Sequence, residues 1–266
     1  MRRISIYGAG HLTKSFLVGL NQTCFDRPIK MYNRTFDKVF ELKNNYSKII
    51  QVNNVVELVN DGSFVFLIIP PSAIIELDTN FTASIFKSNS LIVSCANYLN
   101  IDKLNMLFPQ SKIVRLLPNI NWQILQGTTI YAANSNVTKD DLSELFDILK
   151  PITRLYKANS DADFDTLGKL TSCGPGLFSK LIDQITISFG IPNDEQKQAI
   201  YQTLAGTMNY LIDSKKSPIE VISEVANNGG LTESGIIAAN KNLSDCFDYI
   251  SKSMDNRLIE RKQMIK

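Results

Sequence analysis

The chain has 266 residues, of which 44% are hydrophobic and 20% charged, and its net charge is +2. This composition is typical of one large globular domain or two modest ones, and it argues against nucleic acid or an anionic membrane as a partner. Four cysteines without a CxxC pair and a single histidine argue against a zinc site. The longest apolar run, 64–69, is too short to span a bilayer, and no signal peptide is expected. We therefore expect no metal, no membrane contact and a reducing, cytoplasmic setting.

Short apolar runs alternate with helical patterns in the first part of the chain. Strands are expected at 3–7, 29–32, 48–52, 64–69, 91–94, 112–117, 128–133 and 152–158, and helices at 11–20, 35–45, 101–108 and 138–149, with a short helix before 64. Such alternation predicts βαβ units and a parallel sheet. Thr138 with Asp141 three residues later fits a helix N-terminus.

From about Asp161 onwards the pattern predicts helices and no strand. Helices are expected at 175–190, at 193–214 with Asn193 or Asp194 as its cap, at 217–226, and from the end of the 227–230 turn onwards, the third beginning with the Ser217-Pro218 pair. The 175–190 segment has apolar residues on two sides, which favours burial against a second subunit, although packing on the chain's own sheet domain is the alternative. The expected fold is α/β: a Rossmann-like, doubly wound sheet domain over 1–158, then an all-helical dimerisation domain over 159–266.

The stretch YGAGHLTKSF follows the first expected strand and contains a glycine-rich turn. Gly8 allows the chain to turn sharply, and Gly10 leaves room for a pyrophosphate to approach the backbone. The helix beginning at His11 directs free N–H groups at that anion, and His11 itself could donate to phosphate or cap the helix. Thr13 stands where the dinucleotide pattern has its third glycine, so a plain strand-to-helix turn is the alternative.

The second expected strand ends in Asn33, Arg34 and Thr35. An NAD site usually has Asp or Glu here, bound to the ribose 2′-hydroxyl, and this segment has no carboxylate to repel a 2′-phosphate. Arg34 can pair with that phosphate, and Asn33 and Thr35 can hydrogen-bond it. The segment favours NADPH over NADH; a solvated arginine in a capping loop is the alternative.

Two further glycine motifs interrupt helices: TSCGPG at 171–176 and NNGGLT at 227–232. Each presents bare backbone N–H groups at a helix N-terminus, which suits a carboxylate. Taken singly, each motif is more often a turn than a site.

Together the motifs resemble those of the pyrroline-5-carboxylate reductase family. The family patterns GAGNMG, RxMPN, SGSGPA and SPGGxT correspond in order to GAGHLT, RLLPN (115–119), TSCGPG and NNGGLT. The resemblance covers nearly the whole chain, and the last two motifs are the most specific.

The resemblance implies a Rossmann domain followed by a helical domain that interlocks with its twin in a homodimer or larger ring. It implies reduction of 1-pyrroline-5-carboxylate to L-proline, the last step of proline biosynthesis, with NADPH, or NADH as the alternative. The Thr232 hydroxyl would lie against the ring nitrogen as the catalytic group. Substrate binding is expected from Gly229, Gly230, Leu231, Thr232 and Cys173, and cofactor binding from Gly8, Gly10, His11, Leu12, Asn33, Arg34, Thr35, Asn54, Ile69, Pro70, Pro71 and Asn119.

The chain departs from the family patterns near the expected reactive end of the cofactor. Pro70 replaces a lysine, and Asn97 and Tyr98 stand where Ala-Gly is usual. Further replacements lie at Leu12, Thr13, Ser172, Cys173, Asn227 and Asn228. They leave two alternatives open: a reductase of the same fold acting on another imine or keto acid, and a non-catalytic nucleotide-binding regulatory protein of the late-competence kind.

Overall fold

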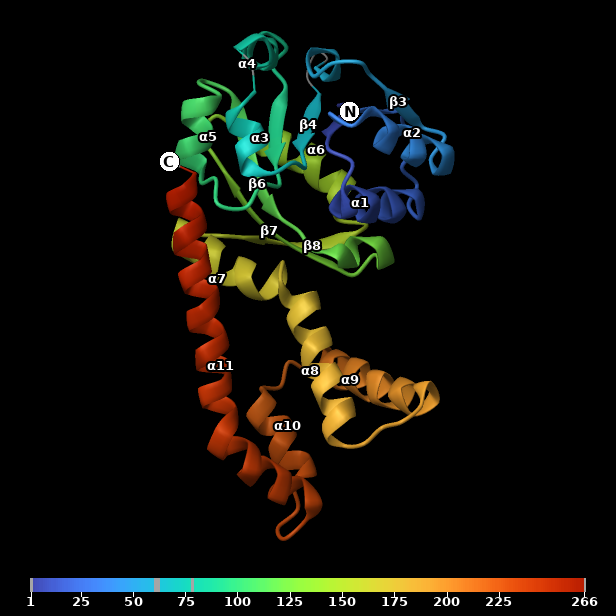
Figure 1. Ribbon diagram of the computed structural model, residues 1–266, viewed down its shortest axis with the longest axis vertical. Coiled ribbons are helices and arrows are strands. Elements are labelled where there is room, and N and C mark those ends of the chain that lie inside the picture. Colours follow the sequence, from blue (N-terminus) through green and yellow to red (C-terminus); the bar gives the residue numbers. More distant parts are fainter. Residues whose placement is uncertain (1, 60–62, 78, 266) are drawn as a thin grey trace. The chain divides into compact units, whose positions relative to one another are not determined.

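The computed structural model describes residues 2–59, 63–77 and 79–265 (Figure 1). It divides into two compact units, one of Met1–Leu177 with Glu260–Lys266 and one of Phe178–Ile259. No helix among the described residues is both long and apolar enough to cross a membrane.

Eight strands form one sheet in the first unit, in the order β3-β2-β1-β4-β5-β6-β7-β8. The strands are β1 (Ile4–Tyr7), β2 (Ile29–Tyr32), β3 (Ile49–Gln51), β4 (Phe64–Leu67), β5 (Leu91–Ser94), β6 (Lys112–Leu117), β7 (Gly127–Ala133) and β8 (Thr153–Lys157). The helices are α1 (His11–Asn21), α2 (Phe36–Asn45), α3 (Pro71–Ile75), α4 (Thr79–Lys87), α5 (Ile101–Leu107), α6 (Lys139–Leu149) and α7 (Asp161–Thr171), with 3-10 turns η1 (Val56–Leu58) and η2 (Ile120–Ile124). Every expected strand is confirmed, but α3, α4 and η2 were not expected.

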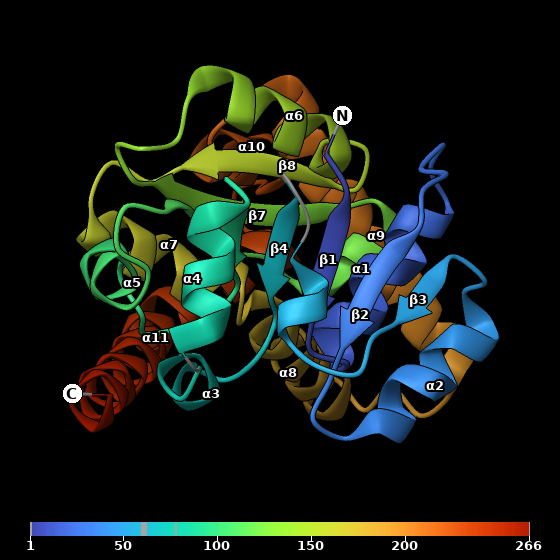
Figure 2. The same ribbon diagram turned by 90° about the horizontal axis from the view of Figure 1, so that it is seen from above.

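Both faces of the sheet are covered, as expected for a doubly wound fold (Figure 2). Along β4, Phe64 and Phe66 pack into one core cluster with α1, α2 and α6, while Val65 and Leu67 pack into another with α3, α4 and α5. Side chains of successive strand residues point to opposite faces, so a run of apolar residues is what a strand buried on both sides requires. This burial explains why the most apolar run of the chain became a central strand.

The sheet is parallel from β3 to β6, but β7 pairs antiparallel to β6. The expectation of a parallel sheet therefore fails at this one pairing. A parallel neighbour needs a crossover of about a dozen residues or more, usually with a helix. Only the short η2 turn separates β6 from β7, whereas α6 separates β7 from β8, which pair parallel.

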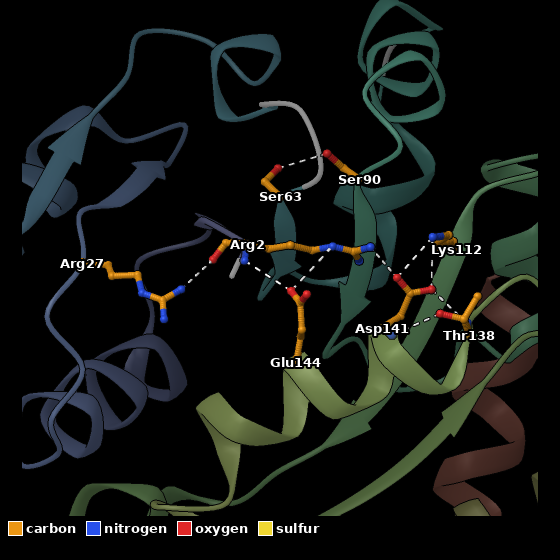
Figure 3. A network of polar contacts seen from close by, with 8 residues as sticks. All are labelled: Arg2, Arg27, Ser63, Ser90, Lys112, Thr138, Asp141 and Glu144. Carbon is orange, nitrogen blue, oxygen red and sulfur yellow. Dashed lines mark hydrogen bonds and ion pairs between the residues drawn. The ribbon is translucent and has the colours of Figure 1, made fainter.

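A buried carboxylate on α6 contacts two segments at the end of the sheet where the strands begin (Figure 3). Asp141 is buried and forms ion pairs with Arg2 and with Lys112, the latter at 3.1 Å. Its carboxylate also accepts the Thr138 N–H at 2.8 Å, while the Thr138 hydroxyl accepts the Asp141 N–H at 3.1 Å. This reciprocal capping box confirms the helix start expected at Thr138.

Helix α7 packs on the first unit, because both ends of the RLLPN motif hold it. The Arg115 guanidinium lies 3.7 Å from the Phe164 ring centroid and 3.5 Å from the Asp161 carboxylate. At the other end of α7, Asn119 Nδ2 donates to the Thr171 carbonyl at 3.1 Å. The first unit therefore extends beyond residue 158, and the domain boundary expected there stays a prediction.

The last helices are α8 (Gly174–Ser188), α9 (Asp194–Ser214), α10 (Pro218–Val225) and α11 (Leu231–Met264). The Asn193 and Ser217 side chains cap α9 and α10, as their sequence positions predicted. Among the described residues after Phe164, no apolar side chain is fully buried in the single chain. Large apolar side chains are instead exposed, among them Phe178, Ile187, Phe189, Met208, Ile212, Leu231, Phe247 and Tyr249.

Candidate functional site

The turn after β1 requires glycine for two reasons. Gly8 has φ +121°, a conformation that side-chain-bearing residues rarely adopt. A Cβ at Gly8 would also lie 2.1 Å from the Ile68 carbonyl oxygen. The Gly8 N–H donates to the Tyr32 carbonyl at 2.9 Å, and the Ile68 N–H donates to Tyr7 at 2.8 Å. The turn is thus held between the ends of β2 and β4, at the edge where these parallel strands finish.

The N-terminus of α1 is open towards this edge. The first bond within the helix runs from the Lys14 N–H to the Gly10 carbonyl at 3.0 Å, so the N–H groups of His11, Leu12 and Thr13 precede it. A Cβ at Gly10 would meet nothing within 4 Å. The first turn, described in full, carries no acidic side chain. This end of α1 can therefore accept an anion such as a diphosphate.

Thr13 replaces the usual third glycine and adds a bond that glycine could not make. Its side chain is fully buried, and its hydroxyl donates to the Gly8 carbonyl at 3.0 Å. The threonine therefore stabilises the turn by a buried hydrogen bond, and the N–H groups at the start of α1 stay free.

The segment after β2 places a cation at the same edge. Arg34 is largely exposed, and Asn33 Nδ2 donates to the Thr35 carbonyl at 3.0 Å, which holds the segment in a turn. The segment itself has no carboxylate, as expected, but a carboxylate from another segment lies beside Arg34. Glu76, directly after α3, approaches the guanidinium to 3.9 Å. The sequence carries no signal for this contact, since the two residues are far apart along the chain.

The segments after β4 and β5 complete the edge. A Cβ at Gly8 would lie 3.1 Å from Ile69 Cγ2, so Ile69 borders the glycine turn. Pro70 precedes α3 and Pro71 is its first residue, where a missing N–H is harmless. Burial raises the pKa of the Cys95 thiol to about 12, which disfavours a thiolate at this position. Tyr98 has φ +74°, a strained conformation for a bulky residue.

Two predicted cofactor residues use their side chains for local structure. The Asn54 side chain bonds to Glu57 of η1: its Oδ1 accepts the Glu57 N–H at 3.0 Å and its Nδ2 donates to Glu57 Oε1 at 2.5 Å. Asn119 holds α7, as described above, and its Oδ1 accepts the Asn121 N–H at 3.2 Å. Their contact with a cofactor stays a prediction.

The two motifs expected to hold substrate both lie at helix N-termini. Cys173 stands between α7 and α8, and its carbonyl accepts the N–H groups of Gly176 and Leu177 at 3.1 and 3.2 Å. In the second unit, Gly229 has φ +73° and precedes α11. Both motifs thus form turns that break one helix and start the next, as the sequence indicated.

Internal bonds reduce the number of N–H groups that the NNGGLT turn can offer to a carboxylate. The Gly229 N–H donates to the Glu233 carboxylate at 2.6 Å, and the Gly230 N–H donates to the Asn227 carbonyl at 2.9 Å. The first bond within α11 runs from Ser234 to Gly230 at 3.1 Å, so the N–H groups of Leu231 and Thr232 remain directed out of the helix end. Sequence reasoning missed Glu233 as an internal acceptor at this turn.

Comparison with known proteins agrees with this architecture. Residues 161–258 match the family model described as pyrroline-5-carboxylate reductase dimerisation. Residues 3–98 match the model described as NADP oxidoreductase, coenzyme F420-dependent. These matches support the resemblance to the pyrroline-5-carboxylate reductase family that the sequence motifs suggested. An oxidoreductase with a Rossmann-like N-terminal domain was expected, and both expectations are confirmed.

Individual relatives of the chain are distant in sequence, but the matches span almost the whole chain. Pyrroline-5-carboxylate reductase 2 of Bacillus subtilis is 24% identical over 245 residues, covering 90% of this chain and 87% of the relative. ComE operon protein 4 of the same organism is 21% identical over 271 residues, covering 99% and 98%. The second of these relatives is named for its operon and not for a reaction.

Solved structures of this family share the fold. A pyrroline-5-carboxylate reductase of Coxiella burnetii has TM-score 0.85 and 21% identity, covering 97% of this chain and 98% of its own. A Plasmodium falciparum pyrroline carboxylate reductase, solved with NADP bound, has TM-score 0.81 and 19% identity, covering 99% and 98%. Both expectations about architecture, the sheet domain and the helical region after it, agree with these folds.

Proposed function

We propose that the protein reduces 1-pyrroline-5-carboxylate to L-proline with NADPH. The observation that carries the proposal is the open N-terminus of α1 behind Gly8, with Arg34 at the same edge of the sheet. The similarity to pyrroline-5-carboxylate reductases supports the reaction, and the structural neighbour solved with NADP bound supports the cofactor.

The residues at this edge fit a dinucleotide. The backbone around Gly8, Gly10, His11 and Leu12 would hold the diphosphate, because α1 directs unpaired N–H groups there. Asn33, Arg34 and Thr35 would hold the 2′-phosphate of the adenosine half. The segment from Ile69 to Pro71 would border the cofactor, with NADH as a weaker alternative ligand.

For the substrate we propose the turns before α8 and α11. The N–H groups of Leu231 and Thr232 would hold the carboxylate, and the backbone at Gly229 and Gly230 would shape the turn. Cys173, in the turn before α8, is a further proposed substrate contact. The Thr232 hydroxyl would lie against the ring nitrogen.

The reaction asks little of side-chain chemistry. Bound NADPH supplies the hydride, which adds to the imine carbon of the protonated substrate, and the nitrogen takes the electron pair and becomes an amine. The chain's own residues position the ring and, at the Thr232 hydroxyl, hydrogen-bond that nitrogen. No histidine or cysteine nucleophile is needed for this step.

We further propose a cytoplasmic homodimer or larger homo-oligomer. The dimerisation-family match and the exposed apolar side chains of the second unit support assembly. The four free cysteines, Cys24, Cys95, Cys173 and Cys246, agree with a reducing compartment.

A second candidate is a paralogue without this reaction. The match to ComE operon protein 4 covers nearly all of both chains. Pro70 and Tyr98, which depart from the family pattern, lie after β4 and β5 at the same edge of the sheet. Such a protein would bind the nucleotide and either reduce another imine or keto acid or turn over nothing.

One assay separates these functions. NADPH oxidation is measured with 1-pyrroline-5-carboxylate and with a panel of other imines and keto acids, beside complementation of a proline auxotroph. Turnover of pyrroline-5-carboxylate with complementation supports the proposal. NADPH binding without turnover on any substrate of the panel would instead identify a nucleotide-binding regulator.

A further inference from the structure

Glu76 brings a negative charge to the cation that we assign to the 2′-phosphate. Its carboxylate lies 3.9 Å from Arg34 Nη1, and both side chains are more than two-thirds exposed, at 68% and 71%. Glu76 follows the last residue of α3, and Arg34 is the second residue after β2. The contact therefore joins two segments at the edge where the parallel strands β1, β2 and β4 finish.

The surroundings of this pair place it beside the end of β1. Tyr7 and Tyr32 are neighbours across β1 and β2, with ring centroids 5.1 Å apart. Burial chiefly raises the pKa of the Tyr7 hydroxyl; the charge of Arg34 opposes that shift and the charge of Glu76 adds to it. The charges of Arg34 and Glu76 therefore both act on the Tyr7 hydroxyl, and Tyr7 directly precedes Gly8.

We propose that Glu76 is a specificity-determining residue that limits the preference for NADPH over NADH. This inference rests on the proposed function, in which Arg34 holds the 2′-phosphate. The carboxylate of Glu76 takes the place of the acidic residue that is missing after β2, but it reaches the site from α3. It draws the guanidinium towards itself and repels a 2′-phosphate, whereas NADH, which lacks that phosphate, meets no such repulsion.

Because its ion pair with Arg34 is weak, Glu76 reduces the affinity for NADPH and does not abolish it. An exposed pair at this separation contributes little to stability, so Arg34 can leave it when a phosphate arrives. The phosphate carries about two negative charges and so competes well for the guanidinium. What remains after binding is the like-charge repulsion between Glu76 and the phosphate, which salt screens because the site is exposed.

The test measures binding and needs no turnover. Isothermal titration with NADPH, NADH, 2′,5′-ADP and 5′-ADP compares the native protein with Glu76→Gln, which keeps the shape and removes the charge. Glu41→Gln, which removes an exposed carboxylate in the middle of α2, is the charge-matched control. We expect Glu76→Gln to bind NADPH and 2′,5′-ADP about 3- to 10-fold more tightly, with NADH and 5′-ADP changed less than about 2-fold.

The gain should shrink when the titration is repeated in about 0.5 M salt, because screening weakens the repulsion. An unchanged NADPH affinity in Glu76→Gln, an equal gain for NADH, or the same gain in Glu41→Gln would overturn the inference. Arg34→Ala tells this failure apart from a failure of the proposed function. If Arg34→Ala loses NADPH affinity while Glu76→Gln is neutral, only the role of Glu76 is wrong; if Arg34→Ala is neutral too, the cofactor assignment is wrong.

Discussion

The Thr13 hydroxyl donates a hydrogen bond of 3.0 Å to the carbonyl oxygen of Gly8, across the turn that joins β1 to α1. Thr13 is fully buried, so water cannot replace the bond. The residue that breaks the glycine pattern thus supports the turn that the pattern describes. The bond leaves the N–H groups at the start of α1 free for an anion.

Replacing Thr13 by Val removes the hydroxyl and keeps the shape of the side chain. We expect the free energy of unfolding to fall by about 1–3 kcal/mol, because the buried Gly8 carbonyl loses this donor. Thr13→Ser keeps the hydroxyl and is the matched control. Chemical denaturation measures both variants, and a Thr13→Val protein as stable as the native one would show that the bond contributes nothing.

The Asp141 network predicts a dependence of stability on pH. Burial disfavours the charged carboxylate, but hydrogen bonds from Thr138 and Lys112 and the charge of Arg2 outweigh burial and hold the Asp141 pKa at about 2, below the usual 3.8. A depressed pKa stabilises the fold above the unfolded value and loses that effect as the pH falls through the folded one. Stability of the order of 2 kcal/mol should therefore disappear between about pH 4 and pH 2.

Asp141→Asn tests this assignment. The variant should be less stable at neutral pH, since Arg2 and Lys112 lose their shared partner, and this part of its acid dependence should be missing. Urea denaturation at a series of pH values measures both effects. An acid dependence identical to that of the native protein would mean that other carboxylates dominate.

Tyr98 predicts a difference between two truncations. At φ +74° a residue with a Cβ is strained, and glycine is not. Tyr98→Gly and Tyr98→Ala both remove the ring, but only the first relieves the backbone, so the Gly variant should be more stable than the Ala variant by about 1 kcal/mol. Melting curves compare them, and equal stabilities would show that the loop relaxes without strain.

Thr232 predicts a defect in rate. If its hydroxyl bonds the nitrogen more strongly as that atom becomes an amine, Thr232→Ala should lower kcat about 10- to 100-fold, with little change in NADPH affinity. Thr232→Ser keeps the hydroxyl and should retain most activity. Thr232 is the second residue of α11, so a role in capping alone predicts lower stability with unchanged kcat. Kinetics and melting curves on the same variants decide between the two.

The second unit predicts an obligate oligomer. Among the described residues after Phe164 no apolar side chain is fully buried, and such a segment lacks the burial that offsets the entropy of ordering it. We expect dimers joined mainly through residues of about 175–255. Ultracentrifugation at micromolar concentration checks this, and a stable, folded monomer would contradict it.

The sequence by itself determined the elements whose signals are local. Apolar runs located the strands, and the caps at Thr138, Asn193 and Ser217 marked helix starts, because a cap needs only residues three positions apart. The glycine turn after β1 was predictable for the same reason. Residues 71–75 and 79–87 escaped prediction, although Pro71 at the first position of α3 was a usable signal.

Only the tertiary structure decided the contacts between segments that are distant in the chain. Three such contacts depend on how the strands are ordered and where their ends meet. They are the antiparallel pairing of β7, the Glu76–Arg34 ion pair, and the contacts of Arg115 and Asn119 with α7. A periodicity along the chain carries information about one element and its buried face, and none about which neighbour covers it. The sequence could therefore assign a cation to the 2′-phosphate but could not reveal the carboxylate that competes for it, because only the folding of the sheet brings α3 to the end of β2.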